Sequence, residues 1–379
     1  MDRIYSRQGN PTNTVAERRI TSLEGAAETV LTSSGQAAIT AALFVLAGSG
    51  DKIVSTASIY GGTRILFGRS FKRMGIDVDY VWDLYSDAEW DAAITPETKA
   101  IYAETLPNPL NDITDLRKVS EVAKRHNLPL IVDNTVGTPA LVLTGQLGAD
   151  IIVHSTTKFM TGHGTAVGGA VVDMGTYDWA NSKRSYPLIQ TAPAGKRTQI
   201  ERFGNRAYAS AVREAVVNDI GFAVSPLTGF LIHQGLETLS LRMQRNTESS
   251  LEIARWLEEQ PEVTAVAYAG LESNPYHSLA LRDYPRGTGS VFGVEIKHGK
   301  KGVRELVNNL TLWSHMTGIG DTRSMVIHPR TSTHMSFDEE TNERLGISEG
   351  LLRLSVGLET TADLIKDFRT GLDAVAKIG

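Results

Sequence analysis

The sequence predicts an α/β protein whose large domain has a mostly parallel sheet and whose C-terminal domain is a smaller α+β unit. Between residues 29 and 175, short β-branched apolar runs alternate with helical patterns. This alternation is typical of a parallel sheet with helices on both faces. In the C-terminal part, strand-like runs mix with helical patterns, which indicates a second domain of different architecture.

The elements of the large domain can be assigned in chain order. Residues 35–47 and 115–126 have helical patterns. The runs "LPLIV" and "ADIIV" are apolar throughout, as expected for strands that are covered on both faces. Strands are expected at residues 52–56, 78–82, 100–105, 128–135, 149–156 and 168–174.

The rest of the chain is less regular. Residues 176–215 are more polar and contain prolines, so we expect an excursion from the sheet that lines a cleft. A long helix is expected from about residue 229 to 259, leading into the second domain. There we expect strands at 290–296, 324–328 and 351–356 and a helix at 361–378 with apolar Leu364, Ile365, Phe368, Leu372 and Val375.

Composition excludes several classes of function. The 379 residues include no cysteine, which rules out disulfides, thiolate catalysis and cysteine-ligated metal. A formal charge of −5 gives no reason to expect nucleic acid or an acidic membrane surface as a partner. No apolar run has the length of a membrane span, and the first residues are too polar for a signal peptide. We therefore expect a cytoplasmic protein that acts on small molecules.

Polar clusters follow the predicted strands, where ligands of open α/β sheets bind. Asn108 follows one strand, Asp133 to Thr135 follow the next, and Ser155 to Lys158 follow a third. A further cluster, "SSGQAA", opens the helix at 35–47. Ser34 is its expected N-cap, so the N–H groups of Gly35 and Gln36 would face an anion.

This set of groups suits pyridoxal 5′-phosphate. Gly35, Ser155 and Thr157 would bind the phosphate, and Lys158 would bind the aldehyde. Asp133 would face the protonated ring nitrogen, which keeps the ring an electron sink.

Tyr60, in "STASIYGGT", follows another strand and offers a flat face that can stack on the ring.

Simpler explanations exist for each residue taken alone. A lysine after a strand is usually solvated, Asp133 could be a turn or helix-cap residue, and Tyr60 a loop aromatic. "STTK" also matches S-x-x-K, but the companion motifs S-D-N and K-T-G are missing. The glycines of "TGHGTAVGG" do not have dinucleotide spacing, and the histidines do not have metal-ligand spacing. The joint placement at strand ends favours the cofactor site, and we expect no metal.

Arg353 is a candidate substrate ligand. In "LLRLSVG", Leu352, Leu354 and Val356 alternate with Arg353 and Ser355, so the arginine faces away from the apolar side. A guanidinium there could bind a carboxylate through two hydrogen bonds. An ion pair on an edge strand is the alternative.

The motifs together resemble the fold-type I pyridoxal phosphate enzymes of cysteine and methionine metabolism, over almost the whole chain. Within this family the chain looks most like the O-acetylhomoserine sulfhydrylase branch, because of "YGGT", "GHGT" and "YDWANSKRSYP". The segments that carry the resemblance occur in the family's order: "YSRQGNPT", "SSGQAA", "IYGGT", "ETLPNP", "VDNTVGTP", "HSTTKFMTGHGT", "QGLETLSLRM", "VIHPRTSTH" and "LLRLSVGLE".

The resemblance implies a role for each matching residue. Lys158, Asp133 and Tyr60 would be catalytic and bind the cofactor, with Arg353 and Asn108 on the substrate carboxylate. Glu104 and Thr135 would support the cofactor from behind. The remaining cofactor ligands would be Gly35, Gln36, Ser155 and Thr157, together with Tyr5 and Arg7, which would bind the phosphate of a neighbouring subunit.

The implied reaction is γ-replacement, in which O-acetyl-L-homoserine and sulfide or methanethiol give L-homocysteine or methionine and acetate, in methionine biosynthesis. A γ-lyase or a cystathionine γ-synthase-type enzyme is the alternative. By the same resemblance, Gly62 occupies the position at which methionine γ-lyases have a cysteine. Gly164-Thr165 differs from the Gly-Asp pair of cystathionine-type members. Both departures weigh against the lyase. Arg330 replaces a residue that is usually small, so an altered substrate pocket is expected.

The resemblance also implies domains and assembly. We expect a shortened N-terminal arm at residues 1–15, a cofactor-binding large domain at 16–245 and a small C-terminal domain at 246–379. We expect a homotetramer, built as a dimer of dimers, whose active sites are shared between subunits.

Overall fold

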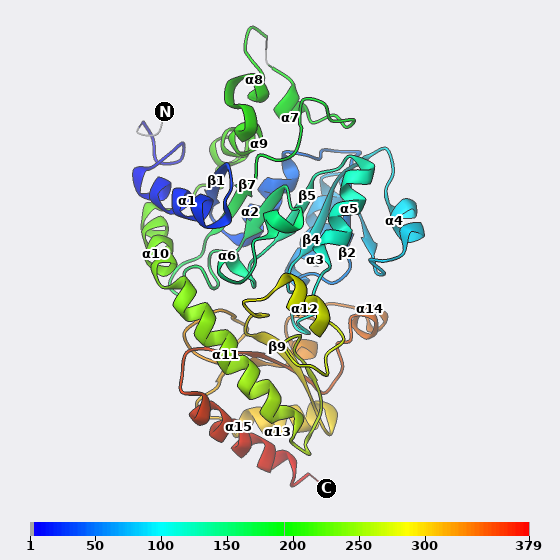
Figure 1. Ribbon diagram of the computed structural model, residues 1–379, viewed down its shortest axis with the longest axis vertical. Coiled ribbons are helices and arrows are strands. Elements are labelled where there is room, and N and C mark those ends of the chain that lie inside the picture. The colour runs from blue at the N-terminus through cyan, green and yellow to red at the C-terminus, as the bar shows by residue number, and fades with distance from the viewer. Residues whose placement is uncertain (1–3, 193, 379) are drawn as a thin grey trace. The chain divides into compact units, whose positions relative to one another are not determined.

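The computed structural model describes residues 4–192 and 194–378. The chain forms two compact units (Figure 1). The first comprises the chain up to Thr105, Thr114–Thr161 and Thr165–Glu237. The second comprises Leu106–Ile113, Gly162–Gly164 and the chain from Thr238 onward. The expected domain boundary after residue 245 falls inside a helix of the second unit, α11 (Leu239–Glu258).

The first unit is built on a seven-stranded sheet of order β1-β7-β6-β5-β4-β2-β3. The five strands from β2 to β6 are parallel, whereas β7 runs antiparallel to both β1 and β6. The mostly parallel sheet that the sequence predicts is confirmed. The strands are β1 (Glu28–Thr32), β2 (Lys52–Thr56), β3 (Asp77–Val81), β4 (Thr98–Glu104), β5 (Leu130–Asp133), β6 (Ile151–His154) and β7 (Gly169–Asp173).

Buried small residues allow α2 to lie close against this sheet. Ala37, Ala38, Ala41 and Ala42 are all buried in the helix, which contacts β6 and β7. The helices of the unit are α1 (Pro11–Glu24), α2 (Gly35–Phe44), α3 (Gly61–Ile65), α4 (Asp87–Ala93), α5 (Leu116–His126), α6 (Thr138–Leu141), α7 (Pro187–Gln190), α8 (Gln199–Phe203), α9 (Ala207–Ala211) and α10 (Pro226–Glu237), with π-helical turns at Leu66–Phe71 and Val212–Asn218.

The segment at 176–215 contributes to the core of the first unit, which differs from the cleft lining that we expected. Trp179, Tyr186 and Tyr208 are buried in a hydrophobic core cluster of this unit. The rings of Trp179 and Tyr208 stack with their centroids 5.4 Å apart. Aromatic side chains bury large apolar areas, so these residues fix a segment that looks irregular and polar in sequence.

The second unit has a five-stranded sheet of order β10-β11-β12-β9-β8, in which only the β10–β11 pair is parallel. Helices α11, α13 and α15 contact one another or this sheet (Figure 1), and Leu364, Phe368, Leu372 and Val375 of α15 are buried as their spacing predicts. The elements are β8 (Val263–Ala267), β9 (Val291–Ile296), β10 (Ser314–His315), β11 (Met325–Ile327), β12 (Leu351–Ser355), α11, α12 (His277–Asp283), α13 (Gly299–Asn308), α14 (Glu339–Arg344) and α15 (Thr361–Val375).

Candidate active site

Asp133, the central group of the candidate site, lies at the carboxyl end of β5, between β4 and β6. Its Oδ1 accepts a hydrogen bond of 2.9 Å from the N–H of Thr135, and its Oδ2 accepts one of 3.3 Å from the Tyr102 hydroxyl. Burial raises the pKa of Asp133, while the hydrogen bonds from Thr135 and the nearby His154 oppose this rise. Asp133 is therefore a buried, oriented acceptor that can face a cationic ring nitrogen.

Thr135 connects Asp133 to the end of the next strand. The Thr135 hydroxyl accepts a hydrogen bond of 2.8 Å from the N–H of Ser155. Thr135 thus contacts both strand ends through different atoms. The support of the cofactor that the resemblance implies for Thr135 stays a prediction.

The N-terminus of α2 meets the same strand end. Ser34 caps the helix by accepting a 3.0 Å hydrogen bond from the N–H of Ala37. Gly35, the first helical residue, lies so close to Ser155 that a Cβ at position 35 would be 2.5 Å from the Ser155 Cβ. The first N–H groups of a helix have no partner within the helix. Gly35, Gln36 and the Ser155 side chain therefore form a small donor-rich surface suited to phosphate.

Tyr60 is attached to this cluster through its backbone and its ring. Its N–H donates a 2.7 Å hydrogen bond to Oε1 of Glu104, at the end of β4. A Cβ at Gly62 would be 2.4 Å from Cε1 of the Tyr60 ring and 2.9 Å from the Gln36 side-chain nitrogen. The ring therefore lies over Gly62 and close to α2, and it is 41% exposed.

Lys158 lies in the turn that follows β6. Its N–H donates a hydrogen bond of 3.1 Å to the carbonyl of Ser155. Lys158 and Ser155, the proposed phosphate donor, therefore belong to the same turn. The Thr157 hydroxyl both donates to the carbonyl and accepts from the N–H of Gly168, each at 3.1 Å. The Thr157 side chain is thus held by the backbone in this structure, whereas the sequence suggests that it binds phosphate.

These residues fit pyridoxal phosphate. The side-chain oxygen of Gln36 is buried and has no hydrogen-bond partner among residues 4–192 and 194–378, so the cluster has polar capacity left for a ligand. The close approach at Gly35 and Gly62 leaves no room for side chains there but keeps backbone donors accessible. A lysine, a buried aspartate and an anion cradle at one sheet edge match the aldehyde, ring nitrogen and phosphate of this cofactor.

Arg353 and Asn108 meet in the second unit. The buried guanidinium of Arg353 donates to the Asn108 side-chain oxygen at 3.2 Å and to the carbonyls of Thr317 and Gly318 at 2.7 and 3.0 Å. Arg353 lies on β12, which pairs with strands on both sides, so the alternative of an exposed edge strand is wrong. The contacts fix the plane of the guanidinium, which prepares it for a carboxylate.

Tyr5 and Arg7 contact residues of their own chain. Arg7 donates hydrogen bonds to the carbonyl and to the side-chain oxygen of Asn218, and its guanidinium lies 5.4 Å from the centre of the Tyr5 ring. Tyr5 is 61% exposed. These contacts do not test the phosphate-binding role expected for the two residues in another subunit.

Tyr102 is a site residue that sequence reasoning missed. It is fully buried on β4, two positions before Glu104, and its hydroxyl reaches Asp133. Alternation along a strand places Tyr102 and Glu104 on the same face, so the period of two could have identified it. The carbonyls of Thr317 and Gly318 that hold Arg353 have no such sequence signal, because they belong to an irregular loop.

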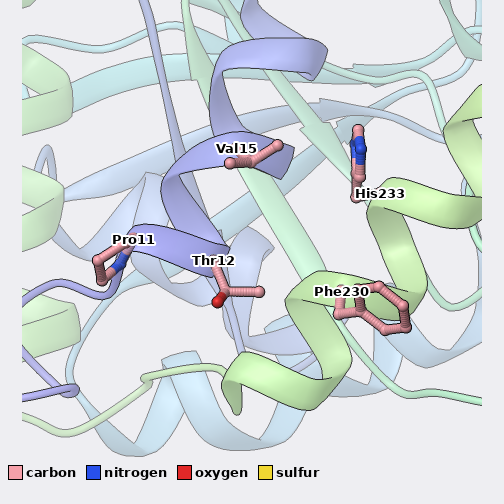
Figure 2. A pocket seen from close by; sticks show the side chains of 5 residues that line it. All are labelled: Pro11, Thr12, Val15, Phe230 and His233. Atoms are coloured by element: carbon pink, nitrogen blue, oxygen red, sulfur yellow. The ribbon is translucent and has the colours of Figure 1, made fainter.

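A separate hollow of about 300 Å³ lies at α1 and α10 and is lined by Pro11, Thr12, Val15, Phe230 and His233 (Figure 2). None of the predicted site residues lines it. Across the described ranges, with residue 193 left out, no helix meets the length and hydropathy needed to cross a bilayer.

The two-unit α/β fold and the strand-end cluster define a class of enzyme, the fold-type I pyridoxal phosphate enzymes. Comparison with known proteins agrees. The sequence profile of the Cys/Met metabolism PLP-dependent enzymes matches residues 2–373. The chain belongs to this family, whose cofactor is pyridoxal phosphate.

Named relatives are similar over nearly the whole chain. An O-acetyl-L-homoserine sulfhydrylase of Corynebacterium glutamicum is 41% identical over 98% of this chain and 86% of its own length. A homocysteine synthase of Schizosaccharomyces pombe is 41% identical over 98% of this chain and 87% of its own. A solved structure from Campylobacter jejuni, named as an O-acetylhomoserine (thiol)-lyase, contains a pyridoxyl-lysine monophosphate. It matches with a TM-score of 0.93 and 33% identity, over 98% of this chain and 88% of that one.

Proposed function

We propose that the protein catalyses γ-replacement on O-acetyl-L-homoserine in methionine biosynthesis. Sulfide, or methanethiol, displaces acetate from the γ-carbon, so a carbon–oxygen bond breaks and a carbon–sulfur bond forms. The names of the relatives at 41% identity support this reaction. The structural observation that carries it lies around the turn that contains Lys158. There, Asp133 contacts Thr135, Thr135 contacts Ser155, and Ser155 lies against Gly35.

The residues of the first unit would hold the cofactor. The N–H groups of Gly35 and Gln36 and the Ser155 hydroxyl would bind its phosphate, and the Asp133 carboxylate would hold the proton at its ring nitrogen. The Thr157 hydroxyl would join them by exchanging its hydrogen bond to the Gly168 carbonyl for one to the phosphate. Tyr60 covers the face of its ring. When bound, the cofactor supplies an electron sink that makes the α- and β-protons of the amino acid acidic.

Lys158 has a second role as acid and base. Its Nζ would take the α-proton of the substrate and return protons to the product. The hydroxyl of Tyr60 assists on the same side. A positioned acid–base group of this kind contributes on the order of 100- to 10,000-fold in rate.

Arg353 and Asn108 would bind the substrate carboxylate. The carbonyls of Thr317 and Gly318 orient the guanidinium before substrate arrives, so less conformational entropy is lost on binding. A bidentate pair with arginine also fixes the direction of the amino acid.

The proposal includes cytoplasmic location and assembly into a dimer of dimers. Tyr5 and Arg7 of one subunit would complete the phosphate site of its neighbour. The exposure of the Tyr5 ring is compatible with such a contact.

Product analysis tests the proposed reaction. Purified protein with pyridoxal phosphate and O-acetyl-L-homoserine is assayed with and without sulfide. Homocysteine and acetate that appear only with sulfide support the γ-replacement. If 2-oxobutanoate and ammonia are the main products even with sulfide present, the chain is a γ-lyase, and cystathionine formed from added cysteine in preference to sulfide indicates a cystathionine γ-synthase.

A further inference from the structure

Two carboxyl groups lie side by side at the centre of the cofactor cluster. Glu104 and Asp133 are partners in the register of the adjacent parallel strands β4 and β5. Tyr102, on the same face of β4 as Glu104, reaches Asp133 with its hydroxyl, which confirms that the two acidic side chains share one face of the sheet. Both residues are buried, with 6% and 9% of their surface exposed.

Two carboxyl groups buried on neighbouring positions of one sheet face do not both ionise, because each charge raises the cost of the other. The hydrogen bonds decide which one keeps the proton. Asp133 accepts from Thr135 on one oxygen and from Tyr102 on the other, whereas Glu104 accepts one N–H, from Tyr60, on Oε1. Donors stabilise the ionised form, so the charge belongs on Asp133 and the proton on Glu104.

We propose that Glu104 is a neutral carboxylic acid and a positioning residue, which fixes the backbone of Tyr60 and leaves Asp133 as the charged partner of the cofactor ring. This inference rests on the proposed cofactor site. It assigns Glu104 a protonation state and a task that its general place behind the cofactor does not define.

The electrostatic surroundings support this assignment. Burial raises the pKa of Glu104 well above its usual value, the charge of Asp133 raises it further, and the Tyr60 N–H lowers it. The phenol of Tyr102, whose own pKa burial raises well above its usual value, stays neutral beside them. The imidazole of His154, which pairs with Glu24 at 2.7 Å, lies near Asp133 and acts to lower the pKa of Asp133.

The positioning of Tyr60 follows from the same geometry. Glu104 holds the Tyr60 N–H at 2.7 Å, and the lack of a side chain at Gly62 allows the ring to lie over that residue. Glu104 thus acts through Tyr60 and Asp133. A second negative charge at this place would change the proton affinity of the ring nitrogen, which a neutral acid does not.

Infrared difference spectroscopy on the cofactor-free protein tests the protonation state without any assay of activity. At neutral pH, wild-type protein minus Glu104→Gln should show the carbonyl band of a protonated carboxyl group. Glu17→Gln is the matched control, because Glu17 is also buried but pairs with Arg213 at 3.1 Å; this variant should keep the band. If the difference spectrum of wild type minus Glu104→Gln lacks this band, the proposal is wrong, whatever reaction the enzyme catalyses.

A spectral titration of the cofactor-loaded protein tests the positioning role. Replacing a neutral acid with an amide should move the midpoint of the cofactor's absorbance titration by less than about 0.3 pH units, whereas removal of a charge would move it by roughly one unit or more. Glu104→Ala leaves the Tyr60 N–H without its carboxyl acceptor and should weaken cofactor binding about tenfold. A midpoint shifted by a unit in Glu104→Gln, or unchanged binding in Glu104→Ala, would overturn the proposal.

Discussion

At the scale of single residues, the contact between Gly35 and Ser155 is the most restrictive feature of the candidate site. A methyl group at position 35 would meet the Cβ, Oγ and Cα of Ser155 at 2.5, 2.8 and 3.0 Å, and strand β6 cannot easily move away because it is paired on both sides. The helix N-terminus can lie this close to Ser155 only because position 35 has no side chain.

We therefore predict that Gly35→Ala weakens pyridoxal phosphate binding by about tenfold or more, since overpacking of this kind costs about 1–3 kcal/mol. Equilibrium titration of the cofactor absorbance measures the effect. Gly68→Ala is the control, because a Cβ there meets nothing within 4 Å, and its affinity should equal that of wild type. Equal affinities for all three proteins would show that the phosphate does not bind at α2.

Sequence reasoning finds the residues that follow the predicted strands, because parallel strands bring their carboxyl ends to one edge. The structure connects four of these residues by direct contacts, from Asp133 to Thr135, from Thr135 to Ser155 and from Ser155 to Gly35. Their roles stay predictions. It does not find that the Thr157 hydroxyl is held by Gly168, because that contact depends on how the chain returns after the turn.

At the scale of elements, the sequence places the strands from β2 to β7 within three residues of their observed ends. It misses β1 and the antiparallel direction of β7. The chain between β6 and β7 is an irregular turn without a crossover helix, so β7 returns beside β6 in the opposite direction. A strand pattern alone carries no information on direction.

The helix expected at 229–259 is two helices, because α10 ends at Glu237 and α11 begins at Leu239. Sequence gives little sign of this break, since no proline or glycine separates the two. Close packing offers a physical reason: a Cβ at Gly235 would be 2.2 Å from the carbonyl of Met160, so the end of α10 is pressed against the turn after Lys158.

Asp173, at the end of β7, makes the stability of the first unit depend on pH. It accepts hydrogen bonds from the N–H groups of Gly175 and Ala209, yet burial raises its pKa to about 7. Between about pH 4 and 7 the folded state therefore holds a proton that the unfolded chain has lost. This contribution to stability is complete below pH 4 and disappears as the pH rises through about 7.

We predict that the free energy of unfolding falls across this range by a few kcal/mol more in wild type than in Asp173→Asn, which cannot titrate there. Chemical denaturation at a series of pH values measures the difference. Asp77→Asn, at an exposed strand end, is the control and should follow wild type. If Asp173→Asn shows the same dependence on pH as wild type, Asp173 is already ionised in the folded protein.

For the molecule as a whole, the chain passes between the two compact units more often than the single boundary predicted from sequence. Leu106–Ile113 and Gly162–Gly164 belong with the second unit although they lie between strands of the first. Contacts explain their place: Asn111 donates to the Thr288 carbonyl at 2.8 Å, and Gly162 lies against the guanidinium of Arg242. A linear boundary cannot represent such excursions, because they depend on contacts between residues far apart in the chain.

The proposed sharing of sites between subunits predicts that two inactive variants restore activity when combined. Arg7→Ala and Lys158→Ala proteins are denatured, mixed in equal amounts and refolded together. Half of random dimers then contain both variants, and one of their two sites has both residues intact, so about a quarter of wild-type activity should return.

Each variant refolded alone is the control and should stay far below this level. If Arg7→Ala alone keeps wild-type activity, Arg7 does not complete a neighbouring site. The same follows if the mixture gains nothing although mixed oligomers form.

Cofactor binding by Lys158 beside Asp133 underlies the whole proposed mechanism, and chemical trapping detects it. Borohydride reduction of the cofactor-loaded protein fixes the cofactor on the lysine that holds it, and peptide mass spectrometry locates that lysine. We expect a pyridoxyl group on Lys158 in wild type and no trapped cofactor in Lys158→Ala. A pyridoxyl group on another lysine, in wild type or with equal yield in Lys158→Ala, would show that Lys158 does not hold the cofactor.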